Sequence, residues 1–165
     1  MHPITHAAAR PDHAAIINAT TGDTVTYGEL DAFANRMARW LRAKGASRGT
    51  SVGLLLENRP LYLELVWSAQ RMGAMLVPIA TRLTAPEIAY ILKDAECSLL
   101  LTSAAFADVT DELAQIMPQL EIVDVDSDAF TQGVAANSPE MIDDPVPGQY
   151  MLYSSGTTGQ PKGIM

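Results

Sequence analysis

Apolar residues recur at helical spacing in the stretch that follows Thr26. The positions at this spacing are Leu30, Phe33, Ala34, Met37 and Leu41. They share one face of a helix. Thr26 and Glu29 have the spacing of a capping box, in which each side chain accepts a hydrogen bond from the other residue's N–H. Gly45 suits the position just past a helix end. The pattern predicts a helix between Thr26 and Gly45.

Short apolar runs alternate with further helical segments along the middle of the chain. The runs cover residues 51–56, 75–79, 98–102 and 122–125. The predicted helices cover residues 60–72, residues 84–93 and a segment that ends near Met117. Such runs are typical of strands buried on both faces of a parallel sheet. The alternation predicts an α/β fold with a doubly wound, mainly parallel sheet and helices on both faces.

The beginning and the last third of the chain are less regular. Residues 4–10 form at most a short helix, because Pro11 disfavours a helical conformation in the residue before it. Residues 14–18 and 24–27 flank Thr21-Gly22-Asp23 and predict a small N-terminal hairpin. Residues 126–149 show little periodicity, so we expect a long surface connection that leads to a buried strand at residues 150–153.

Composition narrows the possible functions. The 165 residues, 48% of them hydrophobic, suit one globular domain. The net charge of −8 argues against a nucleic-acid surface, which needs clustered basic residues. No apolar run reaches the ~18 residues of a transmembrane helix, and residues 1–10 lack the apolar centre of a signal peptide, so we expect a cytoplasmic protein. Cys97 is the only cysteine, which excludes an internal disulfide and a cysteine-based metal cluster.

The most informative stretch follows residues 150–153 and combines glycines, hydroxyl residues and one lysine. Glycines let the backbone turn sharply and point N–H groups at an anion. The hydroxyls and Lys162 add further donors and a positive charge, so the stretch suits a phosphate. Pro161 before the lysine and Gly163 after it do not fit the loop of P-loop NTPases. Taken as composition alone, a Ser/Thr/Gly run is also typical of a flexible tail or turn.

The order of residues in this stretch resembles the phosphate-binding loop of the adenylate-forming superfamily. That family includes acyl-CoA synthetases, firefly-type luciferases and the adenylation domains of peptide synthetases. The matching residues are Ser154, Ser155, Gly156, Thr157, Thr158, Gly159, Pro161, Lys162 and Gly163, with Gln160 at a free position. Residues 26–30 and 71–79 resemble two further motifs of the family, and helix capping and core packing also account for them.

The resemblance implies a reaction in two steps. A carboxylate attacks the α-phosphate of Mg-ATP to give an acyl adenylate and pyrophosphate, and a thiol, usually of coenzyme A, then takes the acyl group. Ser154, Ser155 and Gly156 would line the loop, and Thr157, Thr158, Gly159 and Lys162 would hold the β- and γ-phosphates. The Thr157 hydroxyl is the expected Mg²⁺ contact. Lys162 is the expected catalytic residue, because its charge stabilises departing pyrophosphate.

Members of this superfamily are considerably longer than 165 residues. We therefore expect residues 1–165 to be the N-terminal portion of the large domain of an acyl-CoA ligase and to be inactive alone. The contacts to adenine, ribose, acyl group and coenzyme A would lie elsewhere in the longer protein. The alternatives are an amino-acid-activating adenylation domain and a non-catalytic α/β binding or dimerisation module. Without the rest of the large domain, the strand at residues 150–153 would lose its cover. Since exposed apolar strands recruit other chains, we also expect residues 1–165 to self-associate through it.

Overall fold

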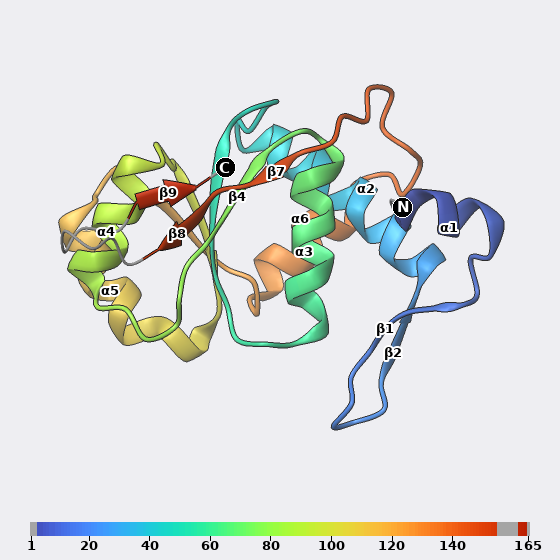
Figure 1. Ribbon diagram of the computed structural model, residues 1–165, viewed down its shortest axis with the longest axis horizontal. Helices are drawn as coiled ribbons and strands as arrows, with labels where there is room; N and C mark the ends of the chain where they lie inside the picture. Colours follow the sequence, from blue (N-terminus) through green and yellow to red (C-terminus); the bar gives the residue numbers. More distant parts are fainter. Residues whose placement is uncertain (1–2, 155–161, 165) are drawn as a thin grey trace.

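A computed structural model describes residues 3–154 and 162–164 of the chain. Its centre is a five-stranded sheet in the order β6-β5-β3-β4-β7, and every neighbouring pair of strands is parallel (Figure 1). The strands are β3 (Ser51–Leu55), β4 (Met75–Pro78), β5 (Leu99–Thr102), β6 (Glu121–Asp124) and β7 (Gln149–Tyr150). The predicted parallel sheet is confirmed.

Helices cover both faces of this sheet, as the sequence predicts. On one face lie α2 (Tyr27–Ala43), α3 (Pro60–Arg71) and α6 (Asp128–Ala135), and on the other lie α4 (Ala85–Asp94) and α5 (Ala107–Ile116). In Figure 1, α4 and α5 lie to the left of the sheet and α3 and α6 to its right. Alternate residues of β3 serve the two faces: Val52 and Leu54 belong to the first core cluster, and Leu55 belongs to the second. The architecture is a three-layer α/β/α domain.

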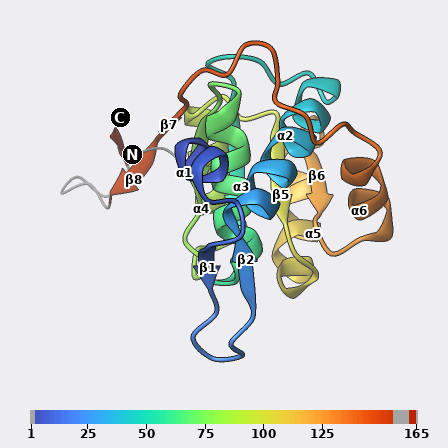
Figure 2. The ribbon, with the colours of Figure 1, turned by 90° about the vertical axis from the view of Figure 1, so that its right-hand side faces the viewer.

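The predicted N-terminal hairpin is also present. Strands β1 (Ala14–Ile17) and β2 (Thr24–Thr26) pair antiparallel and follow the short helix α1 (Pro3–Ala9). Figure 2 shows the loop of this hairpin extending beyond the helices. The chain then enters α2 through the predicted capping box. The Thr26 N–H donates to the Glu29 carboxylate (2.8 Å), and the Glu29 N–H donates to Thr26 Oγ1 (3.2 Å). Gly45 has a φ of 88° just past the helix, which favours glycine.

The connection expected at residues 126–149 contains a helix that the sequence analysis missed. Helix α6 begins at Ser127, whose hydroxyl accepts from the Phe130 N–H (3.2 Å). Phe130 and Val134 are buried, and the Phe130 ring meets Trp40 of α2 edge-on, with centroids 5.4 Å apart. The helix has only eight residues, and two core contacts one turn apart are too few to stand out as a period.

The single buried strand expected at residues 150–153 is wrong. The chain leaves the sheet at Met151, and β8 (Leu152–Ser154) pairs antiparallel with β9 (Lys162–Ile164). Tyr150 and Leu152 are 38% and 53% exposed. Pro78 explains the break. The N–H groups of successive residues in a strand point to opposite neighbours. Those of Met75 and Ile79 donate toward β3, so the backbone of residue 78 faces β7. Proline has no N–H, and pairing between β4 and β7 therefore stops.

A buried ion pair joins the two longest helices. Arg71 of α3 is 3% exposed and donates to Asp31 (2.6 Å) and to the amide oxygen of Asn35 (2.7 Å), both on α2. The Asn35 amide nitrogen donates in turn to the Pro139 carbonyl (2.9 Å). The Arg71 carbonyl accepts from the Val146 N–H (3.1 Å). This cluster of Arg71, Asp31 and Asn35 therefore holds α2, α3 and the last connection together.

The connection passes very close to α3 and β4 just before it reaches β7. The Gly148 N–H donates to the Gln70 carbonyl (2.8 Å), and the Gln149 N–H donates to the Ala74 carbonyl (3.3 Å). A Cβ atom at residue 148 would collide with the Ala74 carbonyl oxygen and lie 2.8 Å from the Gln70 Cα. Only glycine fits this passage, because the backbone atoms around it cannot move aside as a flexible side chain can.

The buried ion pair predicts a large effect of removing Asp31. Asp31→Ala leaves the Arg71 charge buried without its carboxylate, so we expect a loss of about 3–5 kcal/mol in the free energy of unfolding. Arg42→Ala is the matched control, because its pair with Asp144 is solvent-exposed and such pairs contribute about 0–1 kcal/mol. Urea unfolding of both variants measures the difference. Similar losses in the two would contradict the role assigned to the buried pair.

Candidate functional site

The hairpin formed by β8 and β9 brings together two residues of the predicted phosphate loop. Ser154 and Lys162 are direct partners across this hairpin. They are the first and the last phosphate-binding residues of the predicted loop. The remaining predicted residues are Ser155, Gly156, Thr157, Thr158 and Gly159, and all of them, with the expected Mg²⁺ contact, lie outside the described residues.

The two faces of this hairpin differ in chemistry. Side chains alternate along a strand and paired residues share a face, so Tyr153 and Gly163 lie on one face. That face is turned toward the core, since Tyr153 and Met151 pack against the cluster built by α4 and α5. The opposite face carries the Ser154–Lys162 pair next to the pair of Leu152 and Ile164, which are 53% and 55% exposed. The polar donors are thus presented to solvent on an anchored strand pair.

A hydrogen bond ties the inner face of the hairpin to helix α4. The Tyr153 hydroxyl donates to the Asp94 carboxylate at 2.6 Å. Burial of the phenol raises the pKa of Tyr153, and the hydrogen bond and negative charge of Asp94 raise it further. The phenol therefore stays neutral and remains a donor at physiological pH. The sequence analysis missed Asp94, which lies 59 positions from Tyr153 and belongs to no motif.

The donor set at the hairpin suits a phosphate group. Lys162 supplies an ammonium with three donors, and Ser154 supplies a hydroxyl that can donate. Charged donors make the stronger hydrogen bonds to phosphate oxygens. The hairpin also follows directly from the carboxyl end of β7, and open α/β sheets bind their ligands beyond the carboxyl ends of their strands. Both the chemistry and the location of these residues fit phosphate binding.

At the carboxyl ends of β3 and β5, where the order in which strands are added to the sheet changes side, the chain's own charged groups pair with one another. Arg59 lies between Asp126 (2.7 Å) and Glu57 (3.4 Å), and the Ser103 hydroxyl donates to Glu57 (2.6 Å). These groups bind one another across the strand ends. Within the described ranges 3–154 and 162–164, no cluster of three or more His, Cys, Asp or Glu residues is arranged to hold a metal ion.

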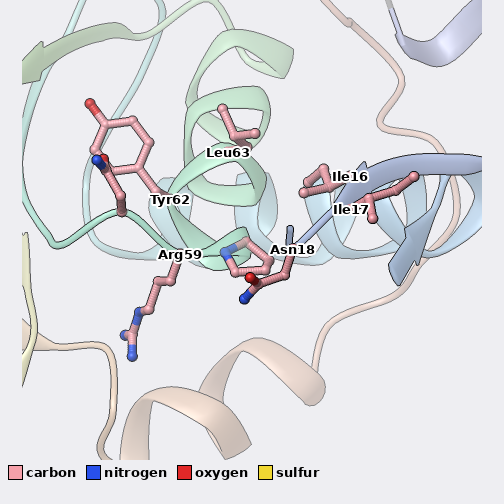
Figure 3. Close-up of a pocket in the computed structure, with 8 residues that line it drawn as sticks. Ile16, Ile17, Asn18, Arg59, Tyr62 and Leu63 are labelled. Atoms are coloured by element: carbon pink, nitrogen blue, oxygen red, sulfur yellow. The ribbon is translucent and has the colours of Figure 1, made fainter. Parts of the chain in front are cut away.

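A separate pocket of about 370 Å³ lies between the N-terminal hairpin and the start of α3. Figure 3 shows Ile16 and Ile17 of the hairpin on one side and Tyr62 and Leu63 of α3 on the other. The Arg59 guanidinium in this view points away from the isoleucines, in agreement with its bond to Asp126. The lining is largely apolar and includes no predicted site residue.

None of the helices in the described part of the chain is long and apolar enough to span a membrane.

Comparison with known families settles what kind of domain this is. A family model described as AMP-binding enzyme matches residues 4–165. The chain belongs to the AMP-binding enzyme family. This agrees with the resemblance inferred from the loop at Ser154 to Gly163. The family match includes the N-terminal hairpin and the whole parallel sheet, so it does not depend on the loop alone.

Relatives of this AMP-binding domain include two kinds of protein. A long-chain-fatty-acid–CoA ligase, FadD13 of Mycobacterium tuberculosis, is 34% identical over 164 residues, which cover 96% of this chain and 33% of FadD13. Tyrocidine synthase 3 of Brevibacillus parabrevis is 31% identical over 155 residues, which cover 94% of this chain and 2% of the synthase. The chain thus spans about one third of the length of the fatty-acid ligase and a small part of the synthase.

A solved structure supports the same placement of this AMP-binding domain. The inhibitor-bound N-terminal domain of FACL13 from Mycobacterium tuberculosis superposes with a TM-score of 0.87 at 30% identity. The superposition covers 98% of this chain and 42% of that domain. The fold of this chain is therefore that of part of the FACL13 N-terminal domain.

Proposed function

We propose that this chain is the N-terminal part of an AMP-forming acid–thiol ligase. A carboxylate oxygen attacks the α-phosphorus of ATP, the bond to the β-phosphate oxygen breaks, and pyrophosphate leaves. The thiol of coenzyme A then displaces AMP from the acyl adenylate to give the thioester. The observation that supports this most is the family match over residues 4–165, together with 34% identity to a fatty-acid–CoA ligase.

Lys162 and Ser154 have roles in the first step. Pyrophosphate departs with several negative charges, and donors that are already in place stabilise that charge as it develops. Lys162 supplies the positive charge, and Ser154, directly opposite, supplies a hydroxyl. Ser155, Gly156, Thr157, Thr158 and Gly159 complete the loop in this proposal. Mg²⁺, held in part by the Thr157 hydroxyl, would neutralise phosphate charge. ATP and coenzyme A are both present in the cytoplasm, which supports a cytoplasmic location in this proposal.

An amino-acid-activating adenylation domain is the second candidate. The 33% identity to the nonribosomal peptide synthetase sidE of Aspergillus fumigatus over 162 residues favours it, because that relative is a peptide synthetase by name. The first step is common to both candidates, and they differ in the acid activated and in the thiol that accepts it. ATP–pyrophosphate exchange with fatty, aromatic and amino acids, followed by a test for the coenzyme A thioester, separates them. A protein that exchanges with none of these acids would be a non-catalytic binding module.

The role of Lys162 predicts a selective kinetic defect in the full-length natural protein. Lys162→Ala should slow adenylation about 10²–10³-fold, because one preorganised charged donor is lost while pyrophosphate departs. Thiolysis of a preformed acyl adenylate should be nearly unchanged, since pyrophosphate has already left. Lys93→Ala is the matched control, because it removes an exposed lysine from α4. Equal losses in both half-reactions would refute this role of Lys162.

We also propose that residues 1–165 self-associate with a second copy through the region around residues 150–153. The exposed apolar side chains of Leu152 and Ile164 lie on one face of the hairpin, next to the short edge strand β7. Exposed apolar edges favour pairing between chains. Light scattering at micromolar concentration should detect a species larger than 17.7 kDa.

Two lysine substitutions test this association surface. Leu152→Lys should reduce the larger species, because a charge on the apolar face opposes its burial. Leu63→Lys is the matched control, since Leu63 is also exposed but lies on α3 and away from the hairpin. A monomeric chain, or an assembly that both substitutions affect equally, would contradict the surface proposed here.

A further inference from the structure

We propose that Tyr153 and Asp94 are positioning residues that hold Ser154 and Lys162 in place for pyrophosphate departure. The inference rests on the function proposed above and adds two residues to it. Neither side chain belongs to the phosphate-binding set, and Asp94 comes from a helix on the opposite side of the sheet from α2 and α3. Their contact is the 2.6 Å hydrogen bond between the Tyr153 hydroxyl and the Asp94 carboxylate.

Asp94 stands at a position that helix stability alone does not favour. It is the last residue of α4. The C-terminal end of a helix carries a partial negative charge, so a carboxylate there is unfavourable and a cation is favourable. Asp94 therefore contributes to the structure through its contact with Tyr153. A charged acceptor also makes a stronger hydrogen bond than a neutral one.

Gly163 completes the contact from the other strand of the hairpin. It is the direct partner of Tyr153 across β8 and β9. A Cβ atom at residue 163 would lie 3.3 Å from both Cζ and Oη of Tyr153, and 3.4 Å from the sulfur of Met151. A side chain at this position would crowd the phenol, which would have to shift by a few tenths of an ångström. The absence of one lets the Tyr153 ring lie against β9 while its hydroxyl reaches Asp94.

This arrangement fixes the hairpin immediately beside the two phosphate donors. Ser154 follows Tyr153, and Lys162 precedes Gly163, so each donor is one residue from the anchor, or about 3.4 Å along the strand. The anchor is on the inner face and the donors are on the outer face, so the anchor does not compete for the ligand. The outer apolar pair of Leu152 and Ile164 is largely exposed. Inner-face contacts therefore determine where the outer donors lie.

The test compares variants of the full-length natural protein in the two half-reactions. Tyr153→Phe keeps the ring packed and removes only the hydroxyl, and Asp94→Ala removes the acceptor. Each should lower kcat for adenylation about 10- to 100-fold, because an error of about 1 Å in position has effects of this size. The KM for the carboxylate and the rate of thiolysis from a preformed adenylate should not change. The double variant should be no slower than either single variant, because the two residues act through one contact.

Conservative and control variants separate positioning from general stability. Asp94→Asn retains an acceptor and should restore most of the adenylation rate lost in Asp94→Ala. Tyr62→Phe removes a hydroxyl from the separate pocket beside α3 and should leave the rate unchanged. Amide hydrogen exchange at residues 162–164 should become faster in Tyr153→Phe and in Asp94→Ala, but not in Tyr62→Phe. A structural defect elsewhere in the protein would not give this pattern.

Pyrophosphate binding distinguishes failure of this proposal from failure of the proposed function. If the wild-type protein shows no ATP–pyrophosphate exchange with any carboxylate, the ligase proposal is refuted. Calorimetry with pyrophosphate then decides whether Tyr153 has a positioning role. Weaker binding in Tyr153→Phe supports the role. Unchanged binding and unchanged adenylation in this variant overturn it, as do equal losses in adenylation and thiolysis. A wild-type protein that binds no pyrophosphate overturns both proposals.

Discussion

The domain depends on the burial of one positive charge between its two longest helices. Arg71 is almost completely removed from solvent, and burying a charge is costly unless it is paired and hydrogen-bonded. Asp31 and Asn35 of α2 supply both conditions, so one guanidinium group ties α3 to α2. The Asn35 amide and the Arg71 backbone carbonyl also bind the backbone of the last connection, so the residues of this cluster hold the chain where it approaches the edge of the sheet.

At that edge, the parallel sheet ends and the candidate site begins, because Pro78 of β4 lacks an N–H group. After Leu76, the next position of β4 that faces this edge is a proline, which has no N–H to donate, so the terminal strand cannot extend along the sheet. The chain instead turns back on itself as the hairpin of β8 and β9, whose inner face is anchored to α4 through Tyr153. The sheet thus positions the hairpin, and Ser154 and Lys162 lie just beyond the point where β4 and β7 stop pairing. Functional loops carried by a rigid scaffold are common in α/β proteins.

The parts of the fold that the sequence predicted are those specified by neighbouring residues. The capping box of Thr26 and Glu29, the glycine after α2 and the buried apolar runs all act locally, and the parallel sheet follows from their alternation. Helix α6 was missed because its contacts with Trp40 of α2 depend on tertiary packing. The length of the terminal strand depended on Pro78, which lies in another strand. Ser154 and Lys162 are predicted from a motif, whereas Asp94 belongs to no motif and only the structure shows its contact with Tyr153.

The last connection is fixed on both sides of its exposed aspartates, and Arg39 and Arg42 of α2 also bind it at the surface, at Glu140, Met141 and Asp144. Asn35 binds it at Pro139, and Arg71 and Gln70 bind it at Val146 and Gly148. Asp143 and Asp144, between these anchors, are exposed to solvent. Surface loops tolerate added length at little entropic cost when their ends are already held. A fluorescent reporter or an affinity tag inserted between these two aspartates would leave the hairpin undisturbed, whereas even one methyl group at Gly148 would not.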